Sequence, residues 1–491
     1  MITKEEALHR VEQRVSKLRK LVEHAIEARS PIHEVERATF TELMDVGFEL
    51  LTAFVADQGN GNMGLTTQHQ GKALRRLRGK RERCYRSIYG PLEIGRYVYG
   101  TREGQKIDYV PLDARLGLPA GAVSYVLEDW LERMCVKDAF RDSVESLVAL
   151  LGPRAKLSVD TAEEHSRQMA RHAASFRMSQ AIPPADEEGT LLVATADGTT
   201  VPMRRTSSKE AEPSNSDAGG DRERGQARQI AYVGAVYTID RFSRTADDVI
   251  DDLLRKKRAK DRPSPKHKRA WAEMTRPGDR ERKGLLIHGP TDLFAELAVD
   301  CAGRDPNRQK PLICLLDGEK QLWNLQEDWL PRAVQILDIY HASNRLRKVA
   351  ESFHSPDSPD IAPFVEHNLR LLLEGRVGTV IRSFAHLIAL RPLTVEKRKR
   401  VRETITYYQN NREHMKYDEY LAAGYPIGSG VAEGGCAHVV KDRMDTTGMH
   451  WTLEGAPAML QLRTLYLNGD WADFVEHRIQ REQVALYSQA A

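Results

Sequence analysis

Three acidic residues of this 491-residue chain each stand where an apolar segment ends or a helical pattern begins. Asp197 closely follows the apolar run 191–193, Asp317 directly follows 312–316, and Glu433 lies about one turn after Ser429, the expected cap of a helix. A carboxylate at the end of a buried strand is costly to bury unless its charge is compensated. Three such acids brought together would repel, and a divalent cation is the natural neutraliser. The pattern therefore predicts a metal site.

Bulk composition agrees with a large soluble enzyme. A chain of 491 residues is expected to form two or more domains, and its 41% hydrophobic and 29% charged content is typical of globular proteins. The five cysteines are widely scattered, which excludes a disulfide framework. The N-terminal residues lack the apolar stretch of a signal peptide, and the most apolar windows are too short to span a membrane. We expect a cytoplasmic protein.

Residues 1–182 are expected to form a mainly helical region with one β-hairpin. Val11, Val15, Leu18 and Val22 recur at alternating spacings of four and three, which is the seam of two packed helices. That seam is open to two interpretations, packing inside one helical domain or a dimer contact. Further on, alternating residues on both sides of Gly90-Pro91 predict the hairpin.

The net charge of +3 is too small to indicate a nucleic-acid partner, but the distribution of basic residues does. One basic segment leads into the predicted hairpin and is interleaved with tyrosines, which suits phosphate contact and base stacking. A second basic segment runs from Lys256 to Arg269, and the alternative for both segments is a solvated surface. The DNA-binding candidates in these segments are Arg75, Arg76, Arg78, Lys80, Arg81, Arg83, Lys256, Lys257 and Arg258.

Residues 183–341 read first as antiparallel strands and then as strand–helix alternation. Strands are expected over 191–203, 230–239, 312–316 and 334–337. This is the order of an α/β, RNase H-like fold, a mixed sheet flanked by helices. Residues 342–425 read as a helical insertion, and residues 426–491 as the second part of the catalytic domain with the glutamate helix and a C-terminal tail. In that order of elements, the three acids meet despite their distance along the chain.

These blocks resemble the DDE transposases of bacterial insertion sequences, in particular the Kra-type group. The resemblance spans about 191–451 and rests on Asp197-Gly198, on 316–318 followed by Trp323, and on 337–341. It is most specific in Gly428-Ser429-Gly430-Val431-Ala432-Glu433-Gly434-Gly435-Cys436 and in the blocks that follow, 440–444 and 448–451. His450 stands where arginine is more usual in that group.

The resemblance implies that Asp197, Asp317 and Glu433 are the catalytic, metal-binding triad. Hard oxygen ligands suit Mg²⁺ or Mn²⁺, and two ions are expected for phosphoryl chemistry. The alternative for Asp197 and Asp317 is a purely structural role in an Asp-Gly turn. Asp338 is a rival third acid, or else a helix cap, and His341 is a possible accessory residue or an ordinary structural histidine. A zinc site at Cys436 and His438 is disfavoured by its spacing.

The leading hypothesis is a magnesium-dependent DNA transposase that cleaves the ends of a mobile element and joins them to target DNA. Its partners would be double-stranded DNA, namely terminal inverted repeats and target, in the bacterial nucleoid, with a homodimer or higher assembly on DNA. Lys441, Arg443 and Trp451 are further DNA-binding candidates, the alternatives being a solvated face for the cations and buried packing for Trp451. The alternative functions are a nuclease or resolvase of the same fold, or a catalytically silent DNA-binding protein.

Overall fold

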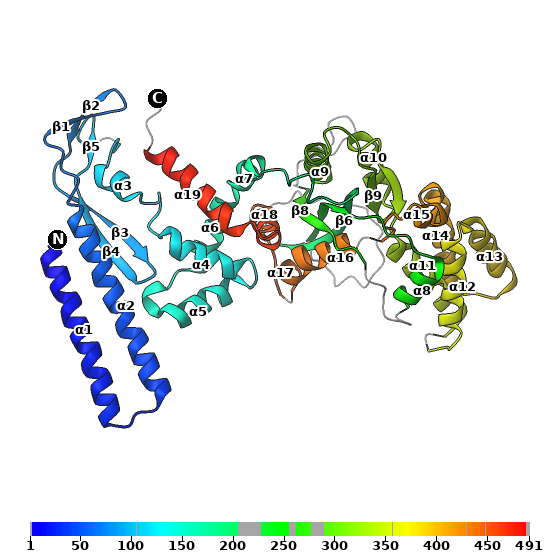
Figure 1. Cartoon of the computed structure of the whole chain (residues 1–491), viewed down its shortest axis with the longest axis horizontal. Coiled ribbons are helices and arrows are strands. Elements are labelled where there is room, and N and C mark those ends of the chain that lie inside the picture. Colours follow the sequence, from blue (N-terminus) through cyan, green and yellow to red (C-terminus); the bar gives the residue numbers. More distant parts are fainter. Residues whose placement is uncertain are drawn as a thin grey trace. The chain divides into compact units, whose positions relative to one another are not determined.

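The computed structural model describes residues 2–104, 106–204, 227–254, 262–275, 289–355, 357–428, 430–446 and 448–487, without the side chains of Ala227, Ala432 and Glu433. The chain divides into two compact units (Figure 1). Unit 1 comprises Met1–Phe176 and Asp470–Ala491, and unit 2 comprises Arg177–Gly469. None of the described helices is both long and apolar enough to cross a membrane.

Unit 1 begins with a helical hairpin. Helices α1 (Lys4–Glu27) and α2 (Ile32–Asp57) lie side by side, and a capping box formed by Thr3 and Glu6 starts α1 (Figure 1). The short strands β1 (Thr66–His69), β2 (Lys72–Arg76) and β5 (Tyr99–Gly100) form one small sheet. Strands β3 (Arg81–Ser87) and β4 (Gly90–Arg96) form the predicted antiparallel hairpin, with residues 88–89 in its turn and Gly90-Pro91 opening the second strand.

The rest of unit 1 is helical. Its elements are α3 (Pro111–Leu116), α4 (Tyr125–Cys135), α5 (Phe140–Leu151), a 3₁₀ turn at Pro153–Ala155, α6 (Val159–Ala170), α7 (Ala173–Ser179), which ends in unit 2, and α19 (Trp471–Tyr487).

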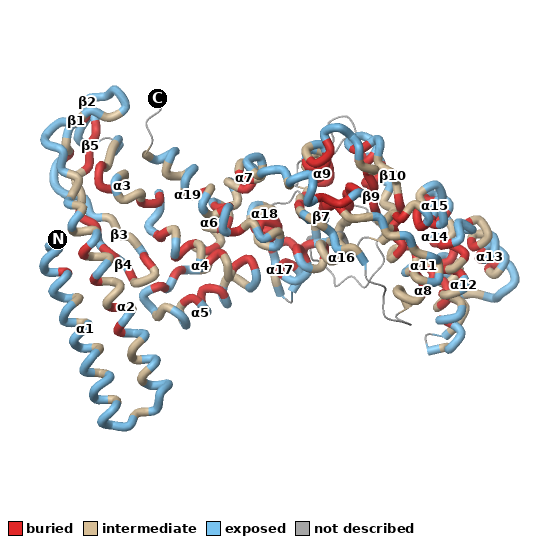
Figure 2. Tube along the Cα trace, viewed as in Figure 1, coloured by how far each residue is buried: buried red, intermediate tan, exposed pale blue. Residues whose placement is uncertain are grey.

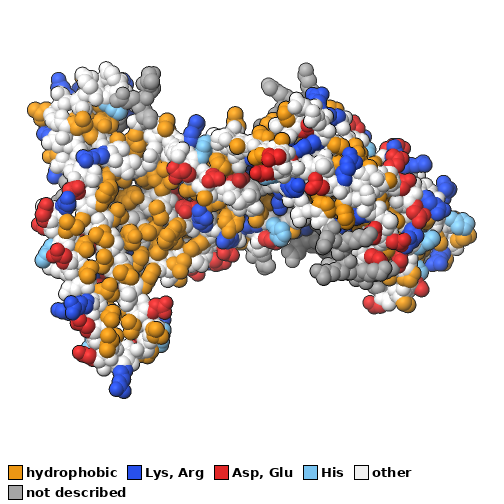
Figure 3. All heavy atoms as spheres, viewed as in Figure 1, with side chains coloured by type: hydrophobic (Ala, Val, Ile, Leu, Met, Phe, Trp, Pro, Cys, Tyr) orange, Lys and Arg blue, Asp and Glu red, His pale blue; other side chains and the backbone are white. Residues whose placement is uncertain are grey.

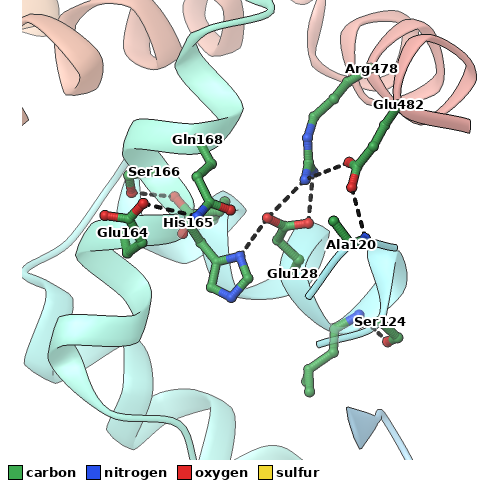
Figure 4. A network of polar contacts seen from close by, with 11 residues as sticks. Ala120, Ser124, Glu128, Glu164, His165, Ser166, Gln168, Arg478 and Glu482 are labelled. Carbon is green, nitrogen blue, oxygen red and sulfur yellow. Dashed lines mark hydrogen bonds and ion pairs between the residues drawn. The ribbon is translucent and has the colours of Figure 1, made fainter. Parts of the chain in front are cut away.

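A buried ion network holds α19 in unit 1. The Glu128 carboxylate on α4 accepts hydrogen bonds from Arg478 Nη1 at 2.7 Å and Nη2 at 3.0 Å, and pairs with His165 Nδ1 at 2.6 Å (Figure 4). Trp471 Nε1 donates to Asp129 at 2.7 Å. These contacts explain why residues 470–491 join the N-terminal unit, whereas the sequence analysis placed them with the catalytic domain. The first boundary also falls near residue 176 rather than 182.

Unit 2 is built on a five-stranded mixed sheet with strand order β10-β9-β6-β7-β8. The strands are β6 (Leu191–Met203), β7 (Ala227–Ile239), β8 (Lys266–Met274), β9 (Leu312–Leu316) and β10 (Val334–Leu337). β6, β9 and β10 are mutually parallel, and β7 is antiparallel to both β6 and β8. All five residues of β9 are buried (Figure 2), because the strand is central and covered on both faces.

Helices cover both faces of this sheet. Leu293 and Leu297 of α9 (Pro290–Arg304) pack against Gly234 of β7 on one face. The adjacent residue, Val233, faces the other side and contacts Gly435 at the end of α16 (Gly430–Gly435). A π-helical turn at Cys436–Lys441 and the short α17 (Asp442–Met444) continue α16, and α18 (Gly455–Leu467) packs on β8.

The remaining helices of unit 2 are α8 (Ala246–Leu253), α10 (Lys320–Trp329) and α11 (Ile339–Phe353), followed by the insertion. The insertion contains α12 (Ile361–Leu373), α13 (Val377–Leu390), α14 (Val395–Asn410), a 3₁₀ turn at Arg412–His414 and α15 (Tyr417–Ala422). Buried tyrosine hydroxyls tie it to the sheet: Tyr417 donates to Leu337 O at 2.9 Å, and Tyr408 donates to Ala342 O on α11 at 2.8 Å.

The strands predicted at 191–203, 312–316 and 334–337 are confirmed, as is a helical region between Ala342 and Ala423. Strand β7 starts three residues before its predicted start at 230. The sequence analysis missed β8 because its basic residues were read as a DNA-binding segment. The mixed α/β class is confirmed by the five-stranded sheet and its helices.

Candidate functional site

Asp197 and Asp317 lie beside each other on neighbouring parallel strands. Ala196 of β6 is in register with Leu316 of β9, so the residue that follows each of them occupies the same level of the sheet. Adjacent strands are about 4.8 Å apart, which sets the spacing of these two backbones. Asp197 lies inside β6 and pairs with Val233, so the alternative of an Asp-Gly turn at this position is wrong.

Asp317, in contrast, does lie in a turn, and that turn is tightly held. Its Oδ1 accepts a hydrogen bond from the backbone N–H of Glu319 at 2.9 Å, and its carbonyl oxygen accepts one from the Tyr407 hydroxyl at 2.5 Å. Gly318 has φ +94°, and a Cβ there would lie 2.9 Å from both Leu337 and the Tyr407 ring. Only glycine fits this conformation without strain, so the turn fixes Asp317 at the end of β9.

The electrostatics of this acid pair favour a cation. Burial raises the pKa of the Asp197 carboxyl, and the charge of Asp317 raises it further, against the opposing effect of His341. Glu319 is affected in the same way, since burial and then the charges of Asp317 and Asp197 raise its pKa. Three carboxyl groups thus repel one another at one edge of the sheet, which is the environment that a hard divalent cation stabilises.

The helix that carries Glu433 is docked over Asp197. The Cys436 side chain, three residues after Glu433, is 4% exposed and lies close enough to Asp197 for each group to shift the pKa of the other. Burial and the charge of Asp197 raise the pKa of this thiol, so it remains protonated and able to donate. The side chain of Glu433 and the residue Ser429 lie outside the described part of the chain.

The glycines around Glu433 have two different surroundings. A Cβ on Gly435 would lie 3.2 Å from Val233, and one on Gly428 would lie 2.8 Å from the Tyr340 ring, so close packing accounts for both. A Cβ on Gly430 would meet nothing within 4 Å. Across the described residues, no group of three or more His, Cys, Asp or Glu side chains lies close enough together to hold a metal, a set that does not include the Glu433 carboxylate.

Asp338 acts as a helix cap. Its backbone N–H donates to Leu316 O at 2.9 Å. Asp338 therefore lies at the end of β10, next to the end of β9 that carries Asp317. The side chain is 3% exposed and its Oδ1 accepts from Tyr340 N at 2.7 Å, which starts α11. The helix-cap alternative is therefore confirmed. His341, in the first turn of the same helix, is close enough to Asp197 to influence its pKa.

Two of the three DNA-binding candidates that follow Glu433 are buried. The Arg443 side chain is 1% exposed, and its guanidinium lies over the Trp451 ring, 4.8 Å from the centroid. Trp451 is 6% exposed and donates from Nε1 to Met444 O at 3.1 Å, so the buried-packing alternative describes it. Lys441 is exposed, as a phosphate contact requires. Arg463 donates to the carbonyls of Val439 and His438 and so satisfies acceptors of the π-helical turn.

The basic residues near the β3–β4 hairpin separate into exposed and structural groups. Arg75, Arg78, Lys80 and Arg81 are exposed, and Arg76 lies over the Tyr97 ring, 4.7 Å from its centroid. Arg83 is different: its Nη1 pairs with buried Asp113 at 2.6 Å, and its Nη2 donates to Gly121 O at 2.7 Å. Arg83 therefore contributes to the packing of unit 1.

The second basic segment is partly described. Lys256, Lys257 and Arg258 lie outside the described residues. Further along the segment, Lys266 pairs with Asp240 at 3.1 Å, and Arg269 pairs with Asp300 at 3.1 Å. Lys266 and Arg269 thus take part in ion pairs along the edge strand β8.

Sequence reasoning assigned no role to Glu319 or Arg244, and it considered Cys436 only as a ligand of the disfavoured zinc site. The Asp-Gly-Glu order around Asp317 was a usable signal for Glu319. Arg244 lines a cavity of about 230 Å³ together with Tyr340, Tyr425 and Val431, the last on the glutamate helix. Its Nε has no hydrogen-bond partner in the described part of the chain, and burial followed by the nearby Arg262 charge lowers its pKa to about 10. No sequence signal pointed to this residue.

Comparison with known proteins adds no family assignment, because neither a protein-family model nor a curated protein matches this chain.

Proposed function

We propose that this chain is a DNA transposase of the DDE type, with an RNase H-like catalytic unit formed by residues 177–469. The observation that carries the proposal is the juxtaposition of Asp197 on β6 with Asp317 at the end of the parallel strand β9, together with the packing of the Glu433 helix against β6. The strand order and strand directions of the sheet are those expected for an RNase H-like core. Glu433 would be the third acid of the triad.

The donor set fits Mg²⁺ or Mn²⁺, because the converging side chains offer hard carboxylate oxygens whose mutual repulsion a cation relieves. Asp197, Asp317 and Glu433 would hold two such ions, which supply activation of the attacking oxygen and stabilisation of the leaving oxygen in an in-line displacement. The chain itself fixes the acids: Tyr407 and Gly318 hold the Asp317 turn, and pairing with Val233 holds the Asp197 backbone within β6.

The proposed reaction has two displacements at phosphorus. A water oxygen attacks the phosphodiester at the element's end, and the 3′-oxygen leaves as a 3′-hydroxyl. That hydroxyl then attacks a target phosphodiester, forming a new bond to phosphorus while the target's own 3′-oxygen departs. No covalent protein–DNA intermediate is needed. The exposed cations Arg75, Arg78, Lys80 and Arg81 of unit 1 would contact DNA phosphates.

A cleavage and strand-transfer assay with the full-length protein tests the proposal. The DNA substrate is the sequence that flanks the gene, searched first for inverted repeats, and the products are resolved with Mg²⁺ and with EDTA. Asp197→Asn, Asp317→Asn and Glu433→Gln should each abolish cleavage while end binding persists. Asp338→Asn is the matched control, because asparagine caps a helix as well as aspartate does and activity should survive.

Each alternative gives a distinct result. A nuclease or resolvase would cut the ends without producing joined molecules. A silent DNA-binding protein would bind the ends but yield no Mg²⁺-dependent product. Loss of activity in Asp338→Asn together with full activity in Glu433→Gln would transfer the third position to Asp338. Neutralising Arg78 and Arg81 together should lower the salt dependence of binding by about one unit per lost contact, and an unchanged slope would contradict the DNA-contact assignment.

A further inference from the structure

Helix α2 buries three of its acidic residues. Glu42, Asp45 and Glu49 are each less than a tenth exposed. Arg14 of α1 pairs with Asp45 at 2.7 Å, and Lys17 pairs with Glu42 at 2.5 Å. Acidic side chains are rarely buried unless paired, so these ion pairs define the surface on which α1 and α2 meet.

The apolar residues of the same two helices are turned outward. Seven of them are between 37% and 56% exposed, although Leu, Val and Phe are the types most often buried. Val11 and Leu18, the other members of the predicted seam, are half-buried along the side of α1 that carries buried Ala7, so only Val15 and Val22 of the seam are exposed. The seven exposed residues are Leu8, Val15, Val22, Phe40, Leu43, Leu50 and Phe54, and we call them the hairpin face.

Helical geometry places both stripes of the hairpin face on one side of the helical pair. At 100° per residue, the stripe on α1 lies about 130° around the helix from the mean direction of Arg14 and Lys17, which face α2. The stripe on α2 lies about 145° in the same sense from the mean direction of Glu42 and Asp45. Because the helices are antiparallel, equal senses of rotation lead to the same side. In Figure 3 hydrophobic side chains gather over this part of unit 1.

The hairpin face is braced from within unit 1. Gly47 lies within the α2 stripe, between Leu43 and Leu50, and a Cβ there would lie 2.4 Å from the Tyr89 ring at the tip of the β3–β4 hairpin. This close approach seats α2 on the hairpin, so the exposed side chains are presented by a supported element. The stripe on α1 repeats every seven residues, and the stripe on α2, with Gly47 included, alternates spacings of three and four; both repeats are those by which helices pack against other helices.

We propose that the hairpin face binds the hairpin face of a second copy of this chain, forming an intermolecular four-helix contact. A face that meets its own copy across a two-fold axis is self-complementary, which requires no second kind of surface. Seven large side chains that are about half exposed represent about 700 Å² per copy, close to the about 800 Å² per partner of a stable interface. Patches of this size are uncommon on monomers. The proposal does not depend on the proposed function, since it requires neither metal nor DNA.

Sedimentation of the full-length protein without DNA, over a range of concentrations, tests the proposal. The unmodified protein should be a dimer, and Leu43→Glu combined with Leu50→Glu should raise the dissociation constant at least about 100-fold. Val299→Glu combined with Leu390→Glu is the matched control, because these residues are 74% and 67% exposed on unit 2 and should leave the dimer intact. Circular dichroism of each variant checks that its helices are retained.

Hydrogen exchange in the unmodified protein gives a readout that does not depend on any variant folding. Amides of α1 and α2 should become more protected as protein concentration increases through the dissociation constant. A monomer at all concentrations would overturn the proposal, as would a dimer that persists in the Leu43→Glu, Leu50→Glu variant. Protection of α1 and α2 that is independent of concentration would show instead that the face is covered within one chain.

Discussion

Replacing Asp317 with asparagine should stabilise unit 2 while removing its response to Mg²⁺. Two carboxylates about 5 Å apart repel by about 3 kcal/mol at an effective dielectric constant of 20. Asp197 and Asp317 are both partly exposed, and solvent screening reduces the expected gain to about 1 kcal/mol. Asparagine keeps the oxygen that accepts from Glu319 N, so the turn itself should survive.

The measurement is thermal or urea unfolding in EDTA and in 10 mM Mg²⁺. In EDTA the Asp317→Asn variant should unfold about 2 °C above the unmodified protein. Bound Mg²⁺ should stabilise the unmodified protein by about 1 kcal/mol and the variant by much less. The repulsion requires ionised carboxylates, so the variant's advantage should be complete at neutral pH and disappear as pH falls through the raised pKa of Asp197.

A control variant separates the effect of removing the charge at position 317 from the effect of removing any one negative charge. Asp328→Asn removes one exposed negative charge from α10 in the same unit, and surface changes of this kind alter stability by less than about 0.5 kcal/mol. The reasoning is refuted if Asp317→Asn is less stable than the unmodified protein in EDTA. It is also refuted if the variant retains the full Mg²⁺ response.

Three further outcomes are expected. Arg478→Ala should destabilise unit 1 by about 3–5 kcal/mol in urea unfolding, because it leaves the buried Glu128 carboxylate without its arginine partner. The double variant Glu128→Leu, Arg478→Met should recover much of this stability, because it removes both buried charges. Burial raises the pKa of Glu128, but His165 and Arg478 together lower it below its usual value. The stabilisation of unit 1 by these contacts should therefore be complete above about pH 4.5 and be lost as pH falls below that value. An acid titration followed by circular dichroism measures this loss. Gly318→Ala should reduce DNA cleavage and stability together in paired assays, since its Cβ would clash with Leu337 and Tyr407 at φ +94°; an active, stable variant would show that the turn adapts.

Short-range patterns accounted for most elements of the sheet. The runs 312–316 and 334–337 are strands because continuous apolar residues between turn signals suit strands buried on both faces. The β3–β4 hairpin and the helical insertion followed from alternation and helical periodicity in the same local way. Strand β8 escaped prediction because it is an edge strand, where cations such as Lys266 and Arg269 are tolerated and protect the edge from further pairing.

Tertiary structure decided which residues meet. The sequence identified Asp197 and Asp317 as acidic residues that follow apolar segments. Their adjacency, across 120 positions (317−197), depends on the register of β6 with β9. Charge alone did not distinguish exposed Arg81 from Arg83 or Arg443, because burial is set by partners, Asp113 and Trp451, supplied by other elements. The sequence thus determined the segments and their chemical groups, whereas packing determined which groups are exposed, paired or brought together, since those contacts form between segments that local sequence does not relate.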